Sequence, residues 1–96
     1  MKINFNKNAG NLDMHIEGRL DTTTAPEFES VLMANMNGVN TLTIDCTGLE
    51  YVSSAGLRVL LSAHKRTVGA LTLINVCELV MEVFEITGFV DILTIK

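Results

Sequence analysis

The chain has 96 residues, 48% of them hydrophobic, which is enough to build one domain without a metal or disulfide. Its formal net charge is −4, so nucleic-acid phosphates and anionic membranes are unfavourable partners. No basic segment followed by an apolar core opens the chain, and no apolar run approaches the roughly 20 residues that span a bilayer. We therefore expect one domain over residues 1–96, in a cytoplasmic protein.

Five regions of apolar residues predict a β-sheet. Alternating residues in 3–5 and 12–16, separated by turn residues 8–11, indicate an antiparallel hairpin. Further strands are expected over 42–46, 71–76 and 92–95. The alternate positions of the first strands are polar: Asn4, Asn6, Asp13, His15, Glu17, Thr41, Thr43 and Asp45. One face of the sheet should therefore be open to solvent, with helices packed on the other face only.

Three amphipathic patterns predict those helices. The first starts with a capping box formed by Thr24 and Glu27, and the second and third end at Gly69 and Gly88. The side chains expected to face the sheet are Phe28, Val31, Leu32 and Met36, then Leu57, Leu60, Leu61, His64 and Val68, then Val80, Val83, Phe84 and Ile86. The predicted order is β-β-α-β-α-β-α-β, a single α/β domain whose mixed β-sheet opens with the antiparallel hairpin and carries its helices on one face.

Groups suited to catalysis or metal binding are sparse. His15 and His64 lie on different elements without a metal-binding spacing, and Cys46 and Cys77 lie in or beside apolar runs, as buried free thiols do. No glycine-rich phosphate loop or nucleophile elbow occurs. We therefore expect no enzyme, no metal and no cofactor.

Ser53 and Ser54 lie between an apolar strand and an amphipathic helix. Either serine could act only as the helix N-cap, which is the more common role of serine at this position. A helix N-terminus also accommodates a phosphate, so one hydroxyl could instead be a phosphorylation switch.

A second polar group, Asp21-Thr22-Thr23-Thr24, precedes the first helix. Asp21 could bond the backbone of its own loop as an Asx turn, or contact a partner. Both polar groups follow strands, so they can emerge at the same edge of the sheet.

These motifs resemble the STAS domain family, in particular the bacterial anti-sigma-factor antagonists. The resemblance rests on residues 17–21, 24–25, 49–60 and 84–88, in the same order as in the family. It implies a sheet with helices on one side. It also implies a binding protein that captures an anti-sigma factor, itself a serine kinase with a histidine-kinase-like ATPase fold, and so frees a sigma factor. Phosphorylation of one serine ends the capture.

The resemblance assigns roles to individual residues. Alignment on Gly56 makes Ser54 the phosphoacceptor, with Ser53 where many members carry aspartate. The expected partner-binding residues are Asp21, Thr22, Thr23, Ser53, Gly56, Leu57 and Arg58. Family members usually continue into a further C-terminal helix. Without it, apolar atoms near Phe89, Val90 and Ile92 would be bare and would favour a weak homodimer.

Two alternative functions stay open from the sequence. One is a STAS module that is never phosphorylated and serves as a fixed subunit of a lipid-transport or signalling assembly. The other is an enzyme or nucleotide-binding protein that uses the polar edge around Asp21 and Ser54, which the missing phosphate loop and acid/base pair disfavour.

Overall fold

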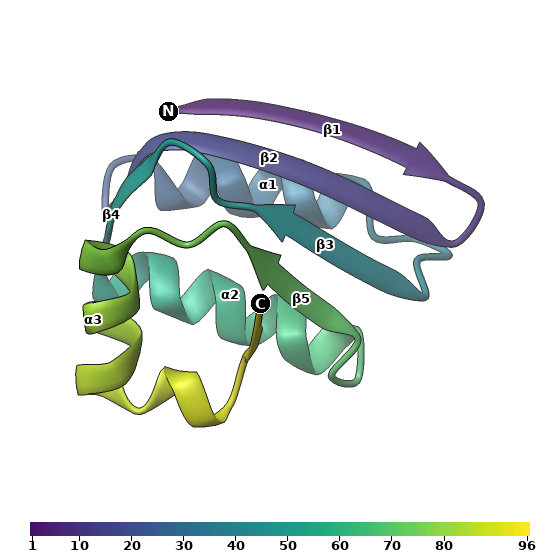
Figure 1. Ribbon diagram of the computed structural model, residues 1–96. Helices are drawn as coiled ribbons and strands as arrows, with labels where there is room; N and C mark the ends of the chain where they lie inside the picture. The colour runs from purple at the N-terminus through teal and green to yellow at the C-terminus, as the bar shows by residue number, and fades with distance from the viewer.

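A computed structural model describes residues 1–96 (Figure 1). A two-stranded hairpin is followed by helices that alternate with strands, and a single turn of 3₁₀-helix, η1, precedes the last strand. The elements in chain order are β1 (Lys2–Asn8), β2 (Asn11–Leu20), α1 (Ala25–Ala34), β3 (Thr41–Asp45), β4 (Leu49–Val52), α2 (Ser54–Arg66), β5 (Leu71–Ile74), α3 (Glu78–Thr87), η1 (Phe89–Asp91) and β6 (Thr94–Ile95).

The sheet is mixed, as the sequence predicts. Its main path has the order β1-β2-β3-β5-β6, in which only the β1–β2 pair is antiparallel. The additional short strand β4 pairs in parallel with the carboxyl-terminal part of β2, past a bulge between Gly18 and Arg19. Gly18 has a φ of 98°, which favours glycine at this bend. The long β2 therefore ends beside β4, and both strands lead into helices at the same edge.

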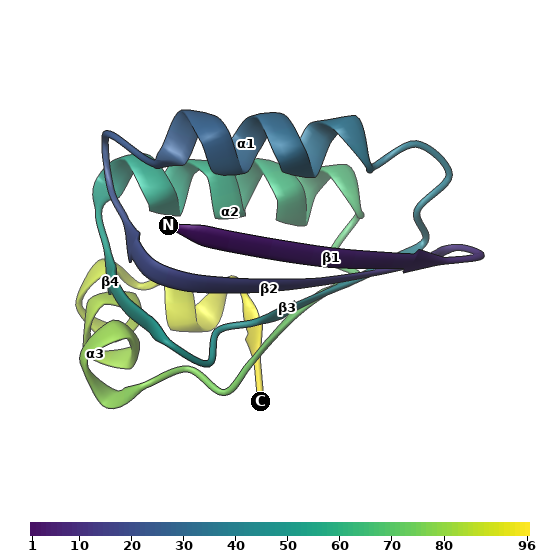
Figure 2. The same ribbon diagram turned by 90° about the horizontal axis from the view of Figure 1, so that it is seen from above.

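Helices α1 and α2 lie side by side on one face of the sheet (Figure 2). A core of 22 buried residues includes Leu12, Ile16 and Ile44 from the strands and Phe28 and Leu60 from the helices. α3 lies at the end of the sheet, beside β4, and contributes Val80 and Phe84 to the same core (Figure 1). The predicted α/β architecture is confirmed, and α1 and α2 form its helical layer.

The buried stripe of α2 differs from the predicted one. Val59, Leu60 and Ala63 are buried, whereas Leu61 is only half-buried and Val68 is 92% exposed. Gly56 and Ala63 belong to this buried stripe but contribute little to a hydrophobicity pattern. At Gly56, which has no side chain, the helix approaches Leu20 so closely that a Cβ would lie 2.6 Å from Leu20 Cγ. Val68 lies beyond the helix, with a φ of 53°. The inward assignments of Leu61 and Val68 are therefore wrong.

Three further expectations need correction. Ile86 is 85% exposed, because it lies two residues after the buried Phe84 and so on the opposite side of the helix. The last strand is only Thr94–Ile95, because the chain still turns at Ile92 and Leu93 after η1. Thr24 is the N-cap of α1 but its side chain makes no capping bond, so no capping box forms with Glu27.

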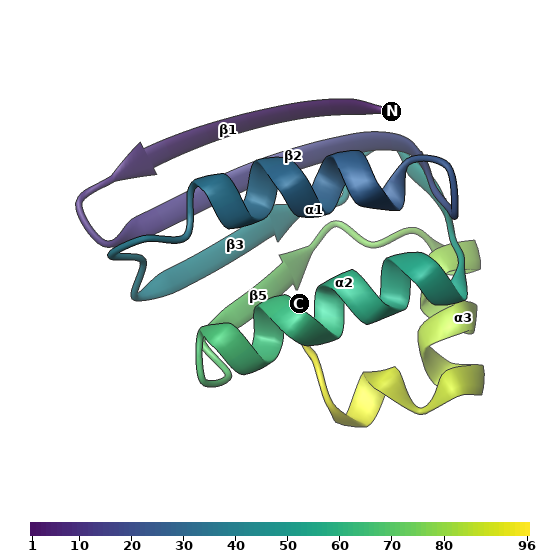
Figure 3. The same cartoon turned by 180° about the vertical axis from the view of Figure 1, so that it is seen from behind.

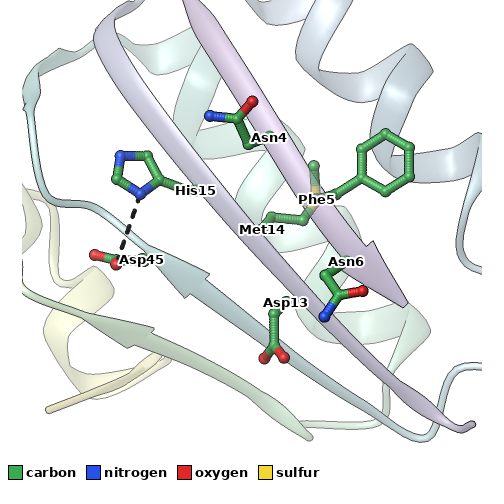
Figure 4. Close-up of a pocket in the computed structure, with 7 residues that line it drawn as sticks. All are labelled: Asn4, Phe5, Asn6, Asp13, Met14, His15 and Asp45. Carbon is green, nitrogen blue, oxygen red and sulfur yellow. Dashed lines mark ion pairs between the residues drawn. The ribbon is translucent and has the colours of Figure 1, made fainter. Parts of the chain in front are cut away.

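The open face of the sheet is less exposed than predicted. Asn4, Asn6, Asp13 and Thr41 are exposed as predicted, whereas His15, Glu17, Thr43 and Asp45 are half-buried. The side chains cover one another: His15 Nδ1 lies 3.7 Å from Asp45 Oδ2 (Figure 4). On its other side, His15 Nε2 lies 3.7 Å from Glu17 Oε2. The face is polar but not fully solvated.

Leu60 and Leu61 offer a test of the layer assignment. Leu60→Ala should lower the free energy of unfolding by about 2–5 kcal/mol, because it removes buried atoms and leaves a cavity. Leu61→Ala should cost clearly less, since this side chain is half-buried and outside the core. Urea unfolding of both variants compares the two losses. A larger loss at Leu61 would contradict the observed orientation of α2.

Asp45 on the open face should make stability depend on pH. The Thr47 hydroxyl, with smaller contributions from the Thr47 amide, Asn75 and His15, lowers the pKa of the Asp45 carboxyl. A carboxyl with a lowered pKa in the folded state stabilises the fold above its unfolded value of about 3.9 and loses this effect as the pH falls through the folded value. The difference in unfolding free energy between wild type and Asp45→Ala should therefore shrink below about pH 4.

Denaturant titrations from pH 7 to pH 2 test this dependence. Asp13→Ala is the matched control, because Asp13 lies on the same face and its carboxylate makes no hydrogen bond or ion pair within the protein. A stability difference for Asp45→Ala that is the same at every pH would refute the explanation.

Candidate functional site

The loop between β2 and α1 is organised around Asp21 and Thr24. Asp21 Oδ1 accepts hydrogen bonds from the amides of Thr23 (3.0 Å) and Thr24 (3.2 Å). The Thr24 hydroxyl donates to the Arg19 carbonyl (2.6 Å) and accepts from the Asp21 amide (2.9 Å). The Asx-turn interpretation of Asp21 is confirmed. This turn leaves Thr22 and Thr23 exposed at the surface.

The electrostatics of this loop favour an ionised carboxylate. The Thr24 amide, helped by the Thr23 amide, the Thr24 hydroxyl and Arg19, holds the pKa of Asp21 below its usual range, against an opposing effect of partial burial. Arg19 Nε lies 3.6 Å from Asp21 Oδ2. The loop therefore carries an ionised Asp21 carboxylate that is paired with the Arg19 guanidinium.

Ser53 and Ser54 mark the junction between β4 and α2. The Ser53 amide donates to the Leu20 carbonyl at 2.9 Å, which fixes this junction to the end of β2. Ser53 occupies the N-cap position, but its side chain makes no capping bond, and its Oγ is buried without a partner. Ser54 is exposed at the first position of the helix. Of the two serines, Ser54 is the one exposed at the surface.

Gly56 and Leu57 do not present a surface. Gly56 is buried, and a Cβ at this position would lie 2.6 Å from Leu20 Cγ and 3.0 Å from the Leu20 carbonyl oxygen. Leu57 is 6% exposed and belongs to the core. The sequence places both residues in the docking surface. The structure corrects this, because the close packing of α2 on β2 turns both inward to support the site.

The other expected residues converge at one edge of the molecule. Leu20 pairs with Val52 in the parallel β2–β4 ladder, so the Asp21 loop and the Ser53–Ser54 junction leave the sheet together. α1 and α2 lie side by side (Figure 3). Thr22 and Arg58 line a groove between the starts of the two helices, which we call the α1–α2 groove. Its lining residues are Thr22, Ala25, Pro26, Glu29, Ala55, Arg58 and Val59. The predicted convergence of the two polar groups is confirmed.

Arg19 and Tyr51 belong to the same edge but were not expected as site residues. The Arg19 guanidinium lies 4.2 Å from the centroid of the Tyr51 ring, and both side chains are exposed. Such a cation–π pair holds a cation and an aromatic ring ready at a surface. The pairing of Arg19 with Tyr51 across β2 and β4 could have revealed it, but a four-residue strand gives too weak a pattern.

Other reactive groups lie away from this edge. No group of three or more His, Cys, Asp and Glu side chains is placed to hold a metal ion. Burial, with smaller effects of Asp45 and Cys77, raises the pKa of the Cys46 thiol to about 12. Cys77 is free but exposed at the N-cap of α3, so the expectation that both thiols are buried is wrong for Cys77. None of the helices is long and apolar enough to cross a membrane.

Comparison with known proteins decides the family. The sequence model of the STAS domain family matches residues 2–96 of this chain. The chain belongs to the STAS domain family. BtrV of Bordetella bronchiseptica is 36% identical over 96 residues, covering 96% of this chain and 83% of the relative. The anti-sigma-B factor antagonist of Listeria monocytogenes is 32% identical over 95 residues, covering 94% and 82%.

Solved structures agree with the STAS fold. The unphosphorylated form of the anti-sigma factor antagonist SpoIIAA has a TM-score of 0.83 and 16% identity, covering 99% of this chain and 88% of that one. An anti-sigma factor antagonist from Mycobacterium paratuberculosis has a TM-score of 0.85 and 18% identity, covering 98% and 83%. STAS proteins of this kind are regulatory binding proteins, so the chain is not an enzyme.

Proposed function

We propose that this STAS domain is a cytoplasmic anti-sigma factor antagonist that acts by partner switching. In its unmodified form it binds an anti-sigma factor that is also a serine kinase, and the bound sigma factor is released. The kinase then transfers the γ-phosphoryl group of ATP to Ser54 Oγ, leaving ADP, and the modified antagonist dissociates. We infer an anti-sigma factor as the partner because the Listeria relative is an anti-sigma-B factor antagonist.

The observation that carries the proposal is the exposed Ser54 hydroxyl beside the Asp21 loop. Ser54 lies at the start of a helix with no acidic residue in its first turn, so a phosphate meets free backbone amides there and no nearby carboxylate on that turn. The same phosphate would bring a charge of about −1.5 to −2 to a surface that already carries the ionised Asp21. The modification is therefore tolerated by the fold and poorly tolerated by a complex.

The proposed docking surface surrounds Ser54 and consists of Asp21, Thr22, Thr23, Ser53 and Arg58. Gly56 and Leu57 are buried beneath this surface and hold α2 against β2. The exposed Arg19–Tyr51 pair adds to it, because aromatic and arginine side chains often dominate binding energy. Of the three apolar residues expected to be bare, Val90 and Ile92 are exposed, whereas Phe89 is half-buried against the core. The weak homodimer stays a prediction.

The test is a capture experiment with the purified chain, with and without ATP. A protein with a histidine-kinase-like ATPase domain should be retained without ATP and released when ATP is added, with phosphate mapped to Ser54 by mass spectrometry. The Ser54→Ala variant should retain the same protein under both conditions. A stable complex without phosphate transfer would favour the alternative, a fixed subunit of a lipid-transport or signalling assembly.

A further inference from the structure

Arg58 is the unpaired cation of the α1–α2 groove. Its side chain is exposed and forms no ion pair or hydrogen bond within the protein, whereas Arg19 at the same edge is held by Asp21 and Tyr51. Glu29 lines the same groove from α1, but no ion pair joins it to Arg58 within 4.0 Å. A guanidinium carries five donors and no acceptor, so Arg58 is free to bind an anion.

Ser54 lies one helical turn before Arg58. Both residues belong to α2, at positions i and i+4, whose side chains are neighbours on the surface of a helix. An anion that precedes a cation by four residues is the more favourable order. A phosphate on Ser54 would offer three strong acceptor oxygens, and guanidinium–phosphate hydrogen bonds are among the stronger ones in proteins.

We propose that Arg58 binds the phosphate of phosphorylated Ser54 and thereby leaves the α1–α2 groove. In the unmodified protein the groove carries one cation and one anion, Arg58 and Glu29. In the modified protein the phosphate neutralises Arg58 and the groove keeps only the negative charge of Glu29. The switch thus changes the charge of a concave surface beside Ser54 as well as the charge at Ser54 itself.

The inference deepens the proposed function, since it concerns the regulation of the same site. A partner that presents a carboxylate to the groove would lose its counter-charge when Ser54 is modified. This loss would add to the direct repulsion between the phosphate and the partner. Arg58 acts here as a positioning residue for the phosphate, and its role is measurable without any partner.

The test uses the full chain with phosphoserine genetically encoded at position 54, so no kinase is needed. A ³¹P NMR titration gives the second pKa of the phosphate in the otherwise wild-type chain and in Arg58→Gln. Pairing with Arg58 should lower this pKa by about 0.3 unit or more relative to Arg58→Gln. Arg66→Gln is the matched control, because Arg66 lies at the far end of the same helix and should leave the value unchanged.

Equal second pKa values in the wild-type and Arg58→Gln chains would overturn the inference. A shift that Arg66→Gln reproduces would also overturn it, because the effect would then be one of net charge. Neither result bears on whether a kinase modifies Ser54 or an anti-sigma factor binds, which the capture experiment decides. The two proposals therefore fail separately.

Discussion

A phosphate on Ser54 is expected to lower the affinity for the anti-sigma factor by about a hundredfold while the domain stays folded. A docking surface shaped for a neutral hydroxyl beside the ionised Asp21 would have to desolvate the phosphate and face like-charge repulsion. A penalty of about 3 kcal/mol is enough for this change in affinity. The fold should be unaffected, because Ser54 is exposed at the start of α2.

Binding titrations and thermal unfolding of the modified and unmodified chains measure the two effects. Ser54→Asp should imitate the phosphorylated form, and Ser54→Ala should bind constitutively. Ser53→Ala is the matched control and should still accept phosphate, because the buried Ser53 Oγ is the less accessible of the two hydroxyl groups. Phosphate found on Ser53, or equal affinities of Ser54→Asp and wild type, would remove Ser54 from the mechanism.

The sheet and the helical layer could be predicted because their signals are periodic and local. Alternation in residues 12–16 and 42–46 placed β2 and β3, and Leu12, Ile16 and Ile44 are buried as that pattern requires. The apolar residues before Ser53 indicated a strand there, but β4 has only four residues and shows no alternation, so neither its bounds nor its pairing with β2 could be predicted. Its pairing is set by the tertiary structure.

Errors in side-chain orientation have two physical causes, one in α2 and one in α3. A hydrophobic pattern weights a residue by its size and polarity, whereas the closest approach of two elements depends on where side chains are small. Gly56 and Ala63 therefore belong to the buried stripe of α2, and the larger Leu61 was misplaced. In α3 the position of the helix at the end of the sheet leaves Ile86 in solvent.

The parts of the candidate site that follow from the order of strands and loops along the chain could be predicted. The parts that depend on contacts between side chains of β2 and β4 could not. Asp21 and Ser54 both follow strands, and the Leu20–Val52 pairing brings them to one edge. The stacking of Arg19 on Tyr51 and the burial of the Ser53 hydroxyl depend on the packing of β4 against β2. The sequence pattern does not contain this packing.

Gly56→Ala is expected to destabilise the domain, although alanine favours a helix by about 1 kcal/mol over glycine. The added Cβ would lie 2.6 Å from Leu20 Cγ and 3.0 Å from the Leu20 carbonyl oxygen. Leu20 is fully buried, and its carbonyl accepts the Ser53 amide, so neither atom can move without disturbing the site. Overpacking of this kind costs about 1–3 kcal/mol, which outweighs the gain in propensity.

Urea unfolding measures this loss, with Ser30→Ala on the exposed side of α1 as the control for helix propensity alone. Ser30→Ala should leave stability unchanged or raise it slightly. The double variant Gly56→Ala/Leu20→Ala keeps the prediction testable: removal of the Leu20 side chain should relieve part of the clash, so the double variant should lose less than the sum of the single variants. Two results would contradict the prediction: losses of stability that are strictly additive in the double variant, or a Gly56→Ala chain as stable as wild type. Either would show that Gly56 is not required for the close packing of α2 on β2, which positions Ser54 beside Asp21.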